Sequence, residues 1–262
     1  MTCVTPPFRR PPFRRYASLS ILRLVWRRLA ALLAYLVMLG AFFLFGLPSA
    51  NAGAGPHAID DAGVETPGLC HVETWTTWGR HNTGLVNASP ACTFHSLPRL
   101  EIGAGLTAER ADSRWDGAFG PALKLNLGRE DSRIDWAVAA EAQIGARSGE
   151  FSGAALTMPV SFEVSDTVRL NANLAWSHDP SADRRNAAFY GAQIEYDLRP
   201  DLMLMAEAYQ RYRETLGVQA GLRWTPDQGP LDFDFLIGLP DGGRETQVTL
   251  GLTFRGAPFQ RR

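Results

Sequence analysis

Ionisable side chains occupy alternate positions within several apolar stretches of the sequence. Asp135 and Glu141, for example, lie among Ile134, Trp136 and Ala140. Successive side chains of a β-strand point to opposite faces, so these charges would share the face opposite to the apolar one. The same parity assigns nine acidic and five basic residues to the polar face: Glu101, Asp135, Glu141, Glu163, Glu195, Asp197, Glu207, Asp232 and Asp234, with Lys124, Arg169, Arg211, Arg223 and Arg255. Lining an enclosed lumen, their net charge of −4 would favour small cationic or neutral polar solutes.

Two cysteines flank a segment whose midpoint falls at His81. Antiparallel pairing about that midpoint places Cys70 opposite Cys92, which predicts a disulfide that closes the first hairpin. The alternative is a copper or zinc site that combines both cysteines with His71, His81 and His95. His81 is expected at the far end of the hairpin from the cysteine pair, so we predict no metal site.

A run of Ser177, His178 and Asp179, with Asp183 nearby, contains the residue types of a hydrolase. Adjacent strand residues point to opposite faces, so the three cannot form a relay on a strand. A loop rich in Ser, Asp and Arg is more commonly a solvated loop. The sequence also contains no phosphate-binding loop, haem-attachment motif or nucleophile elbow. We therefore predict neither an enzyme nor a bound cofactor.

The overall charge of −1 averages two unlike regions. Residues 1–52 contain seven Arg and no Lys, Asp or Glu, whereas the rest of the chain holds 19 basic and all 27 acidic residues, a net −8. An acidic body disfavours a nucleic-acid-binding protein, which needs excess basic charge.

The first 52 residues have the order of a signal peptide. An Arg-rich start ends at Arg28, residues 29–47 are apolar or small, and residues 50–52 read Ala-Asn-Ala. We expect cleavage before Gly53, with an uncleaved membrane anchor as the alternative. Residues 53–68 are rich in Gly, Ala, Asp and Pro and are interpreted as a flexible periplasmic lead-in.

The remainder alternates with a period of two rather than with helical spacing. We expect about twelve strands in residues 69–256, centred near residues 74, 89, 103, 123, 140, 158, 172, 191, 206, 220, 234 and 250, and a short tail at 257–262. The spacing leaves 9 to 12 residues for each strand, the length that a tilted membrane-spanning strand requires. Connections are expected to alternate between tight turns and longer polar loops, such as residues 109–120. The predicted fold is an all-β, antiparallel, up-and-down transmembrane β-barrel.

A soluble exported β-sandwich or lipocalin-like barrel is the other fold that the alternation allows. Three observations disfavour it: alternating runs reach 13 residues, Trp and Tyr recur near strand ends, and the best apolar faces carry no charge.

The sequence resembles Gram-negative outer-membrane β-barrel proteins, and small porin-like transport barrels most closely. Residues 249–254, Thr-Leu-Gly-Leu-Thr-Phe, look like the C-terminal assembly signal of that class. The pattern departs from the usual one in having Gly256 and the tail 257–262 where a terminal aromatic residue would stand. The resemblance implies an outer-membrane location, contact with outer-membrane lipids and recognition of the last strand by the barrel assembly machinery. It also implies passive passage of small polar solutes. The alternative is a barrel closed by its own paired charges, with a structural, assembly or surface-interaction role.

Overall fold

A computed structural model describes residues 56–79, 83–111, 114–129, 132–211, 214–240 and 246–256. These residues all belong to one compact unit of the chain, Phe45–Arg262. The predicted leader, its cleavage site and the predicted tail lie outside them. Among the residues described, no helix is both long and apolar enough to cross a bilayer.

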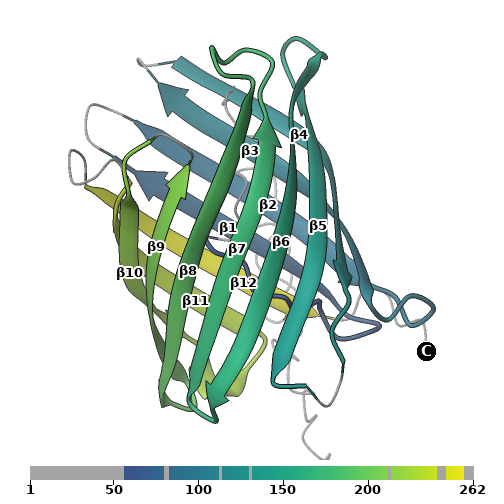
Figure 1. The fold of residues 1–262 in the computed structure, drawn as a ribbon, viewed down its shortest axis with the longest axis vertical. Helices are drawn as coiled ribbons and strands as arrows, with labels where there is room; N and C mark the ends of the chain where they lie inside the picture. Colours follow the sequence, from purple (N-terminus) through teal and green to yellow (C-terminus); the bar gives the residue numbers. More distant parts are fainter. Residues whose placement is uncertain are drawn as a thin grey trace, which may run out of the picture. The chain divides into compact units, whose positions relative to one another are not determined.

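Twelve β-strands dominate this unit (Figure 1). They are β1 (Cys70–Trp78), β2 (Gly84–Thr93), β3 (Leu100–Ala111), β4 (Arg114–Asn126), β5 (Ile134–Gly145), β6 (Phe151–Ser165), β7 (Val168–His178), β8 (Asn186–Arg199), β9 (Leu202–Arg211), β10 (Gly217–Trp224), β11 (Leu231–Leu239) and β12 (Gln247–Gly256). A 3₁₀ turn, η1 (Pro226–Gln228), joins β10 to β11. The period of two therefore located each strand to within a few residues.

Each strand pairs antiparallel with its sequence neighbours, and β12 pairs with β1 to close the barrel. In the closing pair, Cys70 lies opposite Gly256 and Trp78 lies opposite Val248. This confirms the predicted up-and-down antiparallel barrel. Closure leaves no strand edge with unpaired backbone groups.

One predicted connection was wrong. Residues 109–120 were expected to be a long polar loop, but β3 and β4 continue through most of that range, with Arg110 opposite Trp115 and Glu109 opposite Asp116. A hairpin that extends beyond the bilayer does not need an apolar outer face. Its strands therefore lose the sequence period while their backbone ladder continues.

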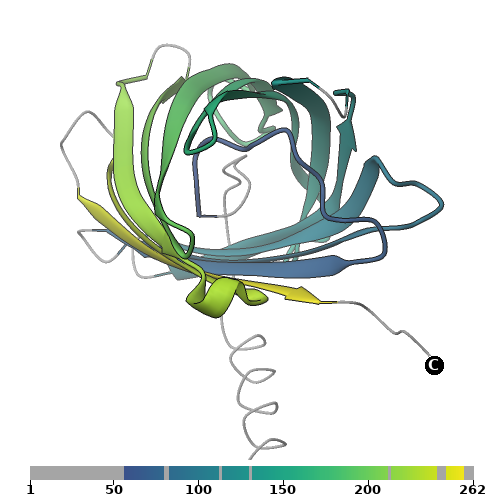
Figure 2. The same cartoon turned by 90° about the horizontal axis from the view of Figure 1, so that it is seen from below.

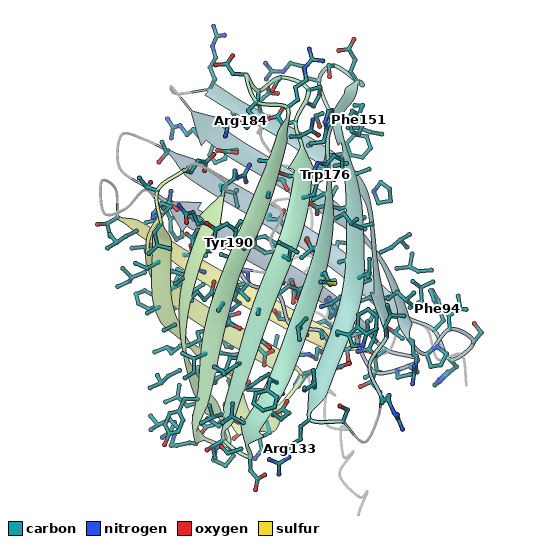
Figure 3. All side chains as sticks on the ribbon, in the orientation of Figure 1. Phe94, Arg133, Phe151, Trp176, Arg184 and Tyr190 are labelled. Carbon is teal, nitrogen blue, oxygen red and sulfur yellow. A yellow bond between two sulfur atoms is a disulfide. The ribbon has the colours of Figure 1, made fainter. Side chains whose placement is uncertain are left out.

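The two faces of the barrel wall differ in polarity in the sense expected of a membrane protein. Large apolar side chains point outward and are exposed, as Leu174 is at 56%, and Trp176 and Tyr190 project from β7 and β8 on the outside (Figure 3). Polar side chains such as Asn171 and Asp232 point inward, and each is only 1% exposed. Such an inverted distribution suits a barrel surrounded by hydrocarbon, and it agrees with an outer-membrane location.

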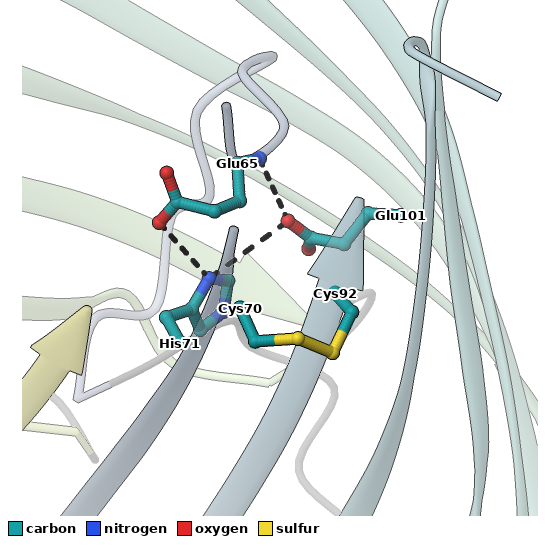
Figure 4. Close-up of a disulfide and its surroundings, with 5 residues drawn as sticks. All are labelled: Glu65, Cys70, His71, Cys92 and Glu101. Atoms are coloured by element: carbon teal, nitrogen blue, oxygen red, sulfur yellow. Dashed lines mark hydrogen bonds and ion pairs between the residues drawn. A yellow bond between two sulfur atoms is a disulfide. The ribbon is translucent and has the colours of Figure 1, made fainter. Parts of the chain in front are cut away.

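The predicted disulfide is present between Cys70 and Cys92, which face each other at one end of the β1–β2 hairpin (Figure 4). The bond lies beside the β1–β12 seam, because Cys70 also pairs with Gly256. It therefore fastens the first hairpin at the point where the barrel closes.

We expect the double variant Cys70→Ser, Cys92→Ser to keep the barrel fold but to lose about 3 kcal/mol of unfolding free energy, because the disulfide restricts a loop of about 20 residues in the unfolded chain. Urea unfolding in lipid vesicles, followed by tryptophan fluorescence, measures the difference. An unchanged midpoint with an unchanged slope would show that the disulfide does not stabilise the barrel.

Candidate functional site in the barrel lumen

A segment of the chain before β1 lies inside the barrel. We call residues 56–66 the lumen segment; Figure 2 shows this part of the chain within the ring of strands. Ile59 and Ala62 are 2% and 0% exposed. This differs from the interpretation of residues 53–68 as a flexible lead-in, because the described part is hydrogen-bonded to the wall along its length.

Residues 57–59 of the lumen segment are held by Glu207 of β9. The Glu207 carboxylate accepts hydrogen bonds from His57 Nδ1 at 2.7 Å, from Ala58 N at 2.8 Å and from Ile59 N at 3.3 Å. The amides of Gln193 and Gln219 donate to the same carboxylate at 2.8 and 3.0 Å. Five donors therefore converge on one buried acid, three of them from the lumen segment.

The His57 imidazole bridges two acids of the wall. Its Nε2 lies 3.5 Å from Asp234 Oδ1, and Asp234 also accepts a hydrogen bond from Arg223 Nε at 2.8 Å. Burial and the Arg223 charge lower the pKa of His57, but the hydrogen bonds to Asp234 and Glu207 outweigh them and raise it to about 9. The raised pKa favours the imidazolium form of His57, whereas Arg223 Nη2, 3.2 Å from His57 Nε2, can donate only to the neutral ring.

The middle of the lumen segment is held by β4, β6 and β7, which lie on one side of the barrel. Asp60 forms an ion pair with Lys124 Nζ of β4 at 2.9 Å, and its backbone N–H donates to Asn173 Oδ1 of β7 at 2.8 Å. Burial raises the pKa of Asp60 to about 7, although Lys124 opposes the shift. Ala62 N donates to Ser161 Oγ of β6 at 2.9 Å, and Ala62 O accepts from Asn126 Nδ2 at 2.9 Å.

The root of the lumen segment lies next to the disulfide (Figure 4). Glu65 N donates to Glu101 Oε2 at 2.8 Å, while the Glu65 carboxylate lies 3.5 Å from both His71 Nδ1 and Arg255 Nε. These contacts come from β1, β3 and β12. The point at which the chain leaves the lumen is therefore tied to the seam strands.

A cavity of about 140 Å³ borders the lumen segment on the side of β1 to β8. Small residues such as Ala91, Gly103, Ala122 and Ala139 line it, which leaves room that larger side chains would fill. Its ionisable lining residues are Asp60, His71, Glu73, Glu101, Lys124 and Glu141. Acids therefore outnumber bases around the open part of the lumen.

The polar-face residues predicted from sequence fall into three environments. Four are buried, namely Glu195, Glu207, Asp232 and Asp234; eight are half-buried, namely Glu101, Lys124, Asp135, Glu141, Arg169, Arg211, Arg223 and Arg255; and two are exposed near strand ends, namely Glu163 and Asp197. Many of them pair with one another, as Asp232 does with Arg255 and Glu163 with Arg169. Whether they line a conducting path stays a prediction.

Sequence reasoning missed Glu73 and the charged residues of the lumen segment. Glu73 lies in β1 between Val72 and Thr74, so the same parity rule identifies it once β1 is delimited. His57, Asp60 and Glu65 have no comparable pattern, because the segment is neither strand nor helix.

The weaker chemical candidates are not assembled into sites. His178 Nδ1 lies 3.0 Å from Asn186 Oδ1, and Asp179 accepts from Ser181, so their hydrogen bonds do not form a catalytic relay. In the described ranges, no group of three His, Cys, Asp or Glu residues is arranged to hold a metal ion. His81 of the alternative metal site lies outside those ranges.

Comparison with solved structures shows the same kind of barrel. The KdgM porin, in a complex with disordered oligogalacturonate, superimposes with a TM-score of 0.56 at 10% identity, over 70% of this chain and 98% of that one. The NanC porin gives a TM-score of 0.53 at 10% identity, again over 70% and 98%. These likenesses show the fold.

No match was found among curated proteins. One family model, described as uncharacterised conserved protein UCP029691, matches residues 41–256, which include the whole barrel and the lumen segment. The chain is therefore a porin-like outer-membrane β-barrel that belongs to this family.

Proposed function

We propose that this protein is a passive outer-membrane channel for small polar solutes, with a preference for cations. Solutes diffuse through the part of the lumen that the lumen segment leaves free. Wall charges set the selectivity, and no cofactor or covalent step takes part.

The observation that carries this proposal is the acidic cavity beside the lumen segment. Among the described contacts, neither Glu73 nor Glu141 has a hydrogen-bond or ion-pair partner, although both line the cavity. A carboxylate that faces a water-filled space without a partner attracts mobile cations. These two acids are therefore open to a solute while the lumen segment and Arg223 engage Glu207 and Asp234.

The same geometry indicates that the solute is small and is positively charged or neutral. The lumen segment reduces the free width of the barrel, and the cavity beside it has a volume of about 140 Å³. The KdgM porin binds oligogalacturonate, an acidic oligosaccharide, whereas an excess of acids around this cavity would repel such a solute. The two barrels share a fold, and we infer that they differ in solute class.

A closed barrel with a structural, assembly or surface-interaction role is the second candidate. The hydrogen bonds that hold the lumen segment against β6, β7 and β9 favour it. Outer-membrane lipids around the apolar face, and assembly machinery acting on β12, are partners that both proposals share.

We expect the purified protein, inserted into a planar lipid bilayer, to give small single-channel currents whose reversal potential under a salt gradient indicates a cation preference. The lumen segment narrows the path, which keeps the current small, and the unpaired acids select the sign of the ion. No current at any voltage would contradict the channel and favour the closed barrel.

Replacing Glu141 with Gln should lower the cation-to-anion permeability ratio by up to about fivefold, since one unit charge acting at a few ångströms in water contributes ~1 kcal/mol. Glu163→Gln is the matched control, because Glu163 is exposed at a strand end and already paired with Arg169. Equal permeability ratios for the two variants would refute selection by the cavity acids.

A further inference from the structure

We propose that the lumen segment is a tethered occupant of a solute site centred on Glu207 and Asp234, and that a cationic solute rich in N–H groups displaces it and thereby widens the free part of the lumen. This rests on the proposed channel function and identifies both the solute class and the step that widens the path.

The way Glu207 is satisfied indicates the chemistry of its ligand. The segment presents to it one imidazolium N–H and two neighbouring backbone N–H groups, at 2.7, 2.8 and 3.3 Å. A guanidinium or a polyamine offers the same combination of positive charge and several N–H donors in a small volume. The carboxylate of Glu207 is therefore suited to bind such a group, whether a peptide or a free solute carries it.

Charge balance gives the same answer. The Glu207 side chain is fully buried and so is that of Asp234, while Arg223 is the wall cation beside them. When His57 leaves, two acids face one base, and a buried charge without a partner is costly. Once His57 has left, Glu207 and Asp234 therefore require another cation, and a solute can supply it.

The contacts of the segment allow displacement. Apart from the buried side chains of Ile59 and Ala62, the described contacts of residues 56–62 with the wall are hydrogen bonds and ion pairs. Polar contacts exchange readily for those of a polar competitor or of water. Glu65 stays attached to Glu101 and to Arg255 of the seam strand β12. The segment therefore remains anchored at Glu65 when residues 57–59 leave Glu207.

Amide hydrogen exchange of residues 57–62 tests the proposal without measuring current. Agmatine, which carries a guanidinium and an amine, is the probe, and butylurea is a neutral control with similar N–H donors. We expect agmatine to accelerate exchange of these amides in the intact protein in a saturable manner, and butylurea to leave it unchanged. Exchange that is insensitive to agmatine would overturn the proposal.

Variants of two wall acids supply the second arm. Glu207→Gln should accelerate exchange of the Ala58 and Ile59 amides by about tenfold or more without agmatine, because these amides lose a charged acceptor. Glu195→Gln removes another buried wall acid, one whose hydrogen bonds go to Arg169 and Asn171, and should exchange as the unmodified protein does. Equal exchange in both variants would contradict the assigned role of Glu207.

A cross-link between the lumen segment and β6 tests whether displacement of the segment changes the channel current. Ala62 contacts Ser161 through a hydrogen bond of 2.9 Å, which makes Ala62→Cys with Ser161→Cys the pair to cross-link, and mass spectrometry of the oxidised protein verifies that the bond forms. We expect the oxidised form to keep the basal current but to lose the increase that agmatine produces, and dithiothreitol to restore that increase. The unmodified protein under dithiothreitol controls for loss of Cys70–Cys92. An increase that is unaffected by the cross-link would refute gating while leaving the channel intact. Absence of current in every form, together with agmatine-sensitive exchange, would refute the channel alone.

The protonation of His57 predicts a pH dependence. The pKa of His57 beside Glu207 and Asp234, about 9, exceeds the ordinary 6.5. The charge of His57 therefore stabilises the bound lumen segment fully below about pH 6.5, and this stabilisation is lost as the pH rises through about 9. Glu207 from β9, Arg223 from β10 and Asp234 from β11 are the charged groups that face it. Exchange of the Ala58 and Ile59 amides, normalised to the unstructured rate, should accelerate above pH 9 and should not do so in His57→Gln. The same acceleration in both proteins would contradict an ionic role for His57.

Discussion

Pairing of the backbone in hydrocarbon is the constraint on which the rest of this structure depends. A strand edge that faces lipid leaves N–H and C=O groups without partners, so the sheet must close on itself. The seam between β1 and β12 completes that closure through nine residue pairs. The apolar exterior and the enclosed polar interior are both consequences of this closed ring.

Enclosure creates a second requirement, because acids that point inward lose much of their contact with water. The wall meets it mostly with its own bases: Arg223 pairs with Asp234, and Arg255 pairs with Asp232. Glu207 has no basic wall partner among its described contacts, and the lumen segment provides the missing donors. The wall charge of −4 already counts these bases, and the lumen segment adds three acids, Asp60, Asp61 and Glu65, against His57. The interior therefore stays acidic, and Glu73 and Glu141 are the acids without a described partner beside the cavity.

The sequence was sufficient to predict the barrel because one face of each strand contacts lipid. In β12, Leu250, Leu252 and Phe254 must be apolar to contact lipid, and apolar residues therefore recur at every second position of the sequence. The Cys70–Cys92 pairing followed from the symmetry of a hairpin. The extent of β3 and β4 beyond the membrane was missed, since strand pairing in water places no such demand on side chains.

The lumen segment was beyond prediction for a related reason. Backbone N–H and C=O groups, which nearly every residue carries, make about half of its contacts with the wall. Residues 57–62 therefore show no distinctive side-chain pattern, although they hold the best-satisfied acid of the barrel. Parity could identify Glu207 as an inward-facing residue, but its partner lies 150 positions away in a segment without periodicity.

The fastening of Glu65 to the seam strands has a consequence for how firmly the lumen can be kept occupied. From Glu65 to His57 the chain has nine residues and reaches about 30 Å at most. A displaced His57 is thus confined to a small volume, where its effective concentration is about millimolar. The segment returns to Glu207 as soon as the solute departs. Under the proposed displacement, occupancy of Glu207 depends on the concentration of the solute relative to this local concentration and on the affinities of the two competitors, so the segment occupies the lumen when solute is scarce.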